Sequence, residues 1–108
     1  MSLQAEGAQM SLQQVVLPSL LRGMVGMVTP GLRAVYVRVE ESDAYVRFVY
    51  DHEPTEEDIE DVDDVETEMI ADLHPQITPH LVTEFAPGTR PTARSGEIVA
   101  FMRKEPTP

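Results

Sequence analysis

Apolar and polar positions alternate in two neighbouring segments of the chain. LRAVYVRVE (residues 32–40) and AYVRFVYD (44–51) are rich in β-branched and aromatic residues, and a short polar stretch separates them. This pattern predicts two strands joined as a hairpin. Successive side chains of a strand point to opposite faces, so each strand has one apolar face that we expect to meet the core. The residues on these two faces are Val35, Val37, Val39, Val46, Phe48 and Tyr50.

The opposite face of the predicted hairpin carries Tyr36, Arg38, Tyr45 and Arg47. We expect this face to be open. Aromatic and arginine side chains are enriched in protein interfaces, so the face could contact a partner or form a homodimer contact between two sheets. On a basic protein the same residues would also suggest stacking on nucleic-acid bases.

A helical period is found on either side of the hairpin. The helix predicted before the hairpin is LQQVVLPSLLRGMVGM after Ser11, where Pro18 either kinks the helix or occupies its first turn. The second helix, predicted after the hairpin, is amphipathic, with Thr55 as its cap and Asp58 placed to complete a capping box. The apolar arc of the second helix contains Ile59, Val62, Val65, Met69, Ile70 and Leu73.

Two further strands are predicted at 80–86 and 97–105, which gives the order α-β-β-α-β-β. We find no long connection suited to a parallel crossover. The expected fold is therefore α+β, a four-stranded antiparallel sheet with two helices packed on one face. We expect one domain over residues 11–105, a disordered or cloning-derived N-terminus at 1–10, and a C-terminal tail at 106–108.

Charge narrows the choice of partners. The chain has 108 residues, with 19 Asp and Glu against 8 Lys and Arg, a net charge of -11. Such a protein repels phosphate, which disfavours nucleic acid and acidic membranes. The longest apolar tract is too short for a membrane span and no signal peptide is evident, so we expect a cytoplasmic protein. The absence of cysteine excludes disulfides, thiolate nucleophiles and cysteine-based zinc sites.

The negative charge is concentrated in the middle of the chain. No Lys or Arg occurs between Arg47 and Arg90, whereas thirteen Asp and Glu do. On the second predicted helix these carboxylates face away from the apolar arc without basic partners, although like charges at i,i+4 repel. The face is either simply solvated or a surface for a basic protein. We call its residues the acidic ridge: Glu57, Glu60, Asp61, Asp64 and Glu68.

Glu66 departs from this pattern because it projects into the apolar arc. A buried carboxylate is costly unless it is paired or neutral. We therefore expect an ion pair with Arg22 or Arg33. The alternative is a functional carboxylate.

Evidence for catalysis or metal binding is sparse. Residues 61–66 begin like a calcium loop but lack its turn glycine, and we find no nucleophile elbow or phosphate-binding loop. The alternative function that stays open is a small enzyme or ligand-binding domain. It would use Glu66, or His74 and His80 with Asp72. We predict no cofactor and no metal.

Three segments carry a resemblance to a known family: LLRGMVGMVTPGLRAVYV, VRFVYDHEPTEEDIEDVDDVETEMIADL and GEIVAFMRKE. With these segments the chain resembles small acidic bacterial proteins related to the immunity proteins of contact-dependent growth inhibition systems. Such proteins are cytoplasmic, have no catalytic activity, and neutralise a cognate toxin domain, commonly a nuclease, by direct binding. The resemblance implies a non-enzymatic inhibitor. If so, the acidic ridge is expected to meet Lys or Arg residues of the toxin.

Overall fold

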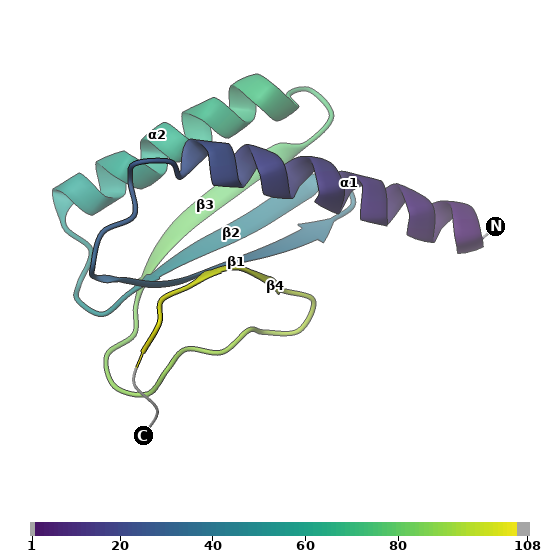
Figure 1. Cartoon of the computed structure of the whole chain (residues 1–108). Helices are drawn as coiled ribbons and strands as arrows, with labels where there is room; N and C mark the ends of the chain where they lie inside the picture. The colour runs from purple at the N-terminus through teal and green to yellow at the C-terminus, as the bar shows by residue number, and fades with distance from the viewer. Residues whose placement is uncertain (1, 106–108) are drawn as a thin grey trace.

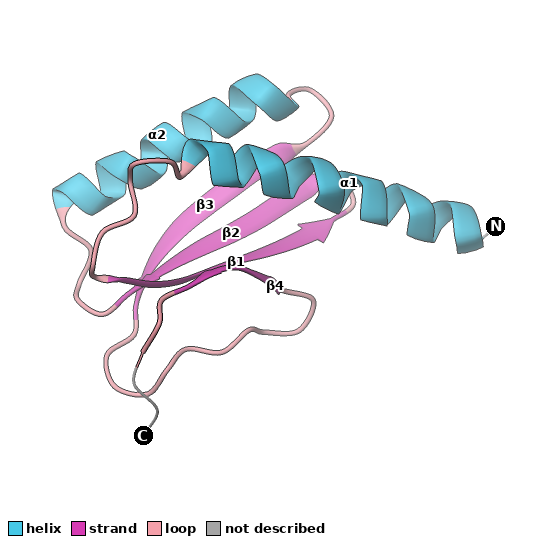
Figure 2. Cartoon of the chain, in the orientation of Figure 1, coloured by secondary structure: helices cyan, strands magenta, loops and turns pink. Residues whose placement is uncertain are grey.

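Two helices cover one face of a four-stranded sheet (Figures 1 and 2). The computed structural model describes residues 2–105, with side chains from residue 13 onward. The predicted number, type and order of elements are confirmed, while the tail predicted at 106–108 lies outside the described residues. The elements are α1 (Ser2–Gly23), β1 (Leu32–Glu40), β2 (Asp43–Tyr50), α2 (Glu56–Leu73), β3 (Thr78–Phe85) and β4 (Ile98–Met102).

The sheet is mixed, so the prediction of a purely antiparallel sheet is wrong. Its strand order is β3-β2-β1-β4. β1 pairs antiparallel with β2 and with β4, whereas β2 pairs parallel with β3. The 18 residues of α2 supply the crossover that a parallel pair requires, because the helix carries the chain back before β3 begins. β3 and β4 are consequently the two edge strands.

The core lies between the helices and the sheet. All six side chains predicted to face inward from the hairpin are buried there, together with Val62, Val65, Met69 and Leu73 of α2. Two predicted members of the α2 arc are not buried, since Ile59 and Ile70 are 44% and 43% exposed. The apolar arc is therefore narrower than the sequence suggested.

The first helix is longer than predicted. α1 begins at Ser2 rather than at Ser11, and Pro18 lies inside it. Val16 and Leu20 on α1 are fully buried in the core, while Pro18 is exposed. No helix in the described range is both long and apolar enough to cross a membrane. The predicted domain boundaries, with a separate segment at residues 1–10 and one domain at residues 11–105, stay a prediction.

α2 begins with the predicted capping box. The Asp58 amide donates to the Thr55 hydroxyl at 3.1 Å, and the Thr55 amide donates to the Asp58 carboxylate at 2.9 Å. Two amides that the helix itself cannot satisfy thereby find acceptors. Glu56 and Glu57 in the first turn also lie at the positive end of the helix dipole.

Candidate functional site

The sheet face opposite the helices is partly covered. The chain between β3 and β4 returns along this side of the sheet (Figure 1), and Ala86 packs on a small apolar cluster that contains Tyr36 and Val49. Tyr36 is 0% and Arg47 6% exposed. The expectation of a fully open face is therefore wrong at these two residues.

Arg47 ties the covering loop to the sheet. Its Nε and Nη2 atoms donate to the two carboxylate oxygens of Glu97 at 2.7 and 2.8 Å, and Nη2 also donates to the Thr92 carbonyl at 2.9 Å. Its guanidinium carbon lies 4.2 Å from the centre of the Tyr36 ring. The hydrogen bonds that Arg47 donates to Glu97 lower the pKa of the Glu97 carboxyl group. The bidentate pair is buried, with side chains only 8% and 9% exposed.

The rest of the predicted sheet interface is accessible. Arg38 lies over the ring of Tyr45 at 4.5 Å, and the ring of His80 stacks on Tyr45 with centroids 5.0 Å apart. A cleft of about 240 Å³ lies beside these side chains, with Glu84 and Arg94 in its lining. A homodimer contact through this face would involve only its exposed part. Such a dimer stays a prediction.

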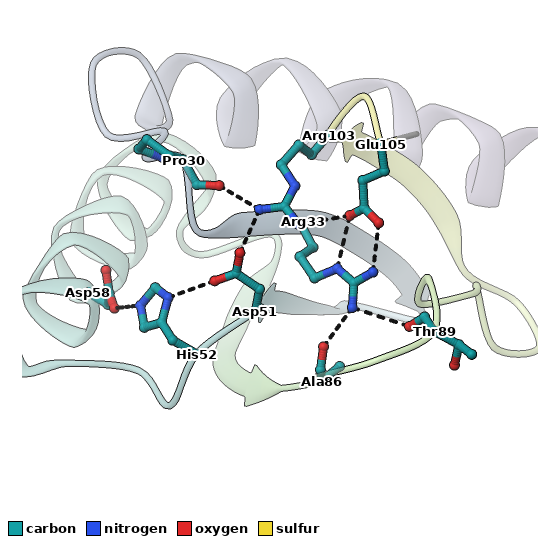
Figure 3. Close-up of polar contacts among 9 residues, drawn as sticks. All are labelled: Pro30, Arg33, Asp51, His52, Asp58, Ala86, Thr89, Arg103 and Glu105. Carbon is teal, nitrogen blue, oxygen red and sulfur yellow. Dashed lines mark hydrogen bonds and ion pairs between the residues drawn. The ribbon is translucent and has the colours of Figure 1, made fainter. Parts of the chain in front are cut away.

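A second buried arginine, Arg33, holds the C-terminal segment. It donates to both carboxylate oxygens of Glu105 at 2.9 and 2.6 Å, and to the carbonyls of Ala86 and Thr89 at 2.7 and 3.2 Å (Figure 3). The hydrogen bonds from Arg33, supported by Arg103, lower the pKa of Glu105 to about 2. Glu105 is thereby fixed as a carboxylate.

The polar network continues from Arg103 to the start of α2 (Figure 3). Arg103 donates to Asp51 at 2.8 Å, and His52 lies between Asp51 at 2.9 Å and Asp58 at 2.7 Å. The His52 ring fills the space beside Gly31, where an added Cβ would lie 2.3 Å from a ring carbon. Glycine at this position therefore allows His52 to reach the cap of α2.

His52 should make stability depend on pH near neutrality. Hydrogen bonds with Asp58 and Asp51 raise the pKa of His52, so protonation favours the folded state. This contribution is complete below the unfolded value of about 6.5 and is lost as the pH rises through the folded pKa. We expect the urea midpoint to be higher at about pH 6 than at about pH 8. His52→Gln should reduce that difference, and an unchanged difference would exclude His52 as its source.

The acidic ridge lies exposed along α2. Glu57, Glu60, Asp64 and Glu68 are exposed, and Asp61 is half-buried. No side-chain carboxylate of these five residues forms a hydrogen bond or ion pair within the described part of the chain. Their charges are thus available to a partner.

The arginine side chains, in contrast, are occupied. Arg90 donates to the Glu105 carbonyl at 3.2 Å, and each of the others contacts a carboxylate of this chain. The positive charge is therefore largely neutralised internally, whereas the ridge projects an uncompensated negative field. The ion pairs are Arg22–Asp72, Arg33–Glu105, Arg38–Glu40, Arg47–Glu97, Arg94–Glu84 and Arg103–Asp51.

Glu66 pairs with neither arginine predicted for it. Its Oε2 atom accepts from the amide of Leu81 in β3 at 3.0 Å, and the side chain is half-buried. Because β3 is an edge strand, this amide would otherwise lack a partner in the sheet. Glu66 therefore has a structural role, which is to accept a hydrogen bond from the edge strand.

Two residues of the alternative site, Asp72 and His80, have other partners. Asp72 accepts from Ser19 at 3.0 Å and from Arg22 at 2.8 Å, while His80 lies 2.8 Å from Asp43. His74 is the exposed C-cap of α2. Within residues 2–105 no group of three or more His, Asp and Glu is arranged to hold a metal ion.

The buried arginine pairs were not predicted. The sequence pattern predicts Arg47 in an interface and Arg33 as a partner of Glu66. One signal was present in the sequence, since Glu97 and Glu105 stand at the two ends of the last predicted strand. Each end could have been matched with a charged residue of the hairpin.

The chain was also compared with known proteins. A family model described as MafI2 immunity protein matches residues 13–105. The matched range contains α2 with its acidic ridge, all four strands and both buried arginine pairs. No curated protein matches the chain.

Proposed function

The chain belongs to the MafI2 immunity protein family, and from this premise we propose that it neutralises a toxin by direct binding centred on the acidic ridge. The family match confirms the resemblance to immunity proteins, and such a protein acts as a binding module rather than a catalyst. The proposal adds the surface and the chemistry of the partner. The toxin would present Lys and Arg residues to the ridge.

The observation that carries this proposal is the contrast between the ridge and the arginines. The ridge carboxylates have no partner among the described residues, while the arginines are used in contacts within the chain. Repulsion along a helix face costs a few tenths of a kcal/mol per pair, and only Glu57, in the first turn of α2, is offset by the helix dipole. A dense field of one sign does, however, steer a partner of opposite charge and discriminates against others.

The proposal is tested with the protein encoded by the gene next to that of this chain in its native genome, where we expect the C-terminal toxin domain. Co-expression of the two is expected to restore bacterial growth and to yield a complex that elutes as one species in size-exclusion chromatography. An unrelated toxin domain serves as the control and should neither bind nor lose its toxicity. Growth inhibition that is equal with and without the chain, together with separate elution, would refute the proposal.

A further inference from the structure

The outer edge of β3 has a defined set of backbone groups. The amide of Thr78 donates to Ser42 at 2.8 Å and that of Ala86 to Tyr50 at 2.9 Å, so both point toward the β2 side. Backbone direction alternates along a strand, and the even-numbered residues between them therefore bond to β2. The amides of Leu81, Thr83 and Phe85 accordingly point away from the sheet.

The first half of this edge has no free backbone donor for an added strand. Pro79 has no amide hydrogen, and the Leu81 amide donates its hydrogen bond to Glu66. Proline and coverage by a neighbouring helix are two means by which proteins protect edge strands from pairing. The second half is different, because no described group accepts a hydrogen bond from the amides of Thr83 and Phe85.

A groove runs beside the open half of the edge. It has a volume of about 310 Å³ between α2 and β3 and is largely apolar, with Asp63 as its charged member. Two of its lining residues are exposed apolar side chains, since Ile59 and Val82 are 44% and 52% exposed. Free backbone groups beside apolar pockets are what an added strand requires, because the backbone gives affinity and the pockets give specificity.

Charge decides between possible occupants of this groove. Asp63 lines it, and the neighbouring Glu60 and Asp64 on α2 are exposed and unpaired within residues 2–105. A second copy of the chain would bring the same carboxylates to the contact, and like charges across an interface are strongly unfavourable. An extended segment with Lys or Arg side chains is complementary.

We propose that β3 receives an extended basic segment of the toxin as an added fifth strand, bonded to the amides of Thr83 and Phe85. Apolar side chains of that segment pack against Ile59 and Val62, and a basic side chain meets Asp63. This inference rests on the proposed function and specifies how part of the interface is built. It differs from ridge binding because it depends on the backbone of β3.

Two substitutions at one position test the inference. Thr83→Pro removes the outward amide while leaving the bonds of β3 to β2 in place, and Thr83→Val retains the amide with a side chain of similar shape. With the adjacent-gene toxin domain as probe, Thr83→Pro is expected to weaken binding about 10-fold or more and Thr83→Val less than about 2-fold. Equal affinities of the two folded variants would overturn the inference.

Amide hydrogen exchange in the unmodified chain gives a second readout, which holds even if Thr83→Pro unfolds the protein. The amides of Thr83 and Phe85 should become protected when the toxin domain binds. A complex that forms while both amides exchange as in the free protein would overturn the added strand and leave the proposed function intact. If no complex forms at all, both proposals fail.

Discussion

Asp64→Lys combined with Glu68→Lys is expected to lower the affinity for the toxin by about 100-fold, which corresponds to about 2.7 kcal/mol. The two residues are exposed neighbours on the acidic ridge. On the proposed ridge interface, their reversal replaces attraction to basic residues of the toxin by repulsion, and it also weakens the field that steers association. The affinity would be measured by titration calorimetry at low and moderate salt. Binding by the native chain should weaken as salt rises.

A matched control separates the ridge from net charge. Glu40→Lys with Glu41→Lys changes the charge by the same amount at two exposed positions, the last residue of β1 and the first residue of the turn that follows it. This control should lose less than about 5-fold in affinity, since only the long-range field changes. Comparable losses for the two double variants would place the interface elsewhere. Unfolding curves of both variants should resemble that of the native chain.

Glu97→Ala is expected to lower the free energy of unfolding by about 3 kcal/mol. The substitution leaves the buried guanidinium of Arg47 without its bidentate partner, at a site where both side chains are nearly excluded from water. Removing one member of a buried pair is costly, and the single bond that Arg47 Nη1 keeps with the Glu84 carboxylate at 3.2 Å replaces only part of the lost bidentate contact. For a domain of this size the Tm should fall by about 15 °C. Thermal and urea denaturation would measure the loss.

Glu40→Ala provides the comparison for Glu97→Ala. Glu40 also pairs with an arginine, Arg38, but its side chain is 64% exposed. Exposed pairs contribute about 0–1 kcal/mol, so this variant should be nearly as stable as the native chain. Similar losses for both glutamates would mean that burial does not determine the strength of the Arg47 pair.

The elements could be predicted because each has a local signal. Alternation located the hairpin, and the Thr55 capping box located the start of α2. These signals depend on a few consecutive residues whose side chains face either core or water. The inward face of the hairpin was predicted correctly for the same reason.

The sheet topology could not be predicted in the same way. Alternation in residues 80–86 indicates a strand but does not state which neighbour it pairs with or in which direction. The amphipathic pattern of α2 predicts only a helix that covers the sheet, whereas α2 is also the connection between the parallel strands β2 and β3. The strand direction follows from that dual role.

Side-chain partners were harder to predict than faces. The sequence predicts an ion pair between Glu66 and an arginine. In the structure the Glu66 carboxylate instead accepts a hydrogen bond from a backbone amide of the edge strand β3. Every residue except proline has a backbone amide, so the residue types do not indicate which amide will be the donor. Likewise, the burial of Tyr36 depends on a loop rich in Pro, Gly and Thr that shows no periodicity of its own.

The two buried arginines bind the loop between β3 and β4 largely through backbone carbonyl groups of the loop. Arg33 bonds the carbonyl of Thr89 and Arg47 that of Thr92. Every amino acid carries this carbonyl, and both threonine residues are exposed. Positions 89 and 92 can therefore accept many side chains while the loop keeps its path, which makes them suitable places to attach a spectroscopic label or to vary sequence in a binder library.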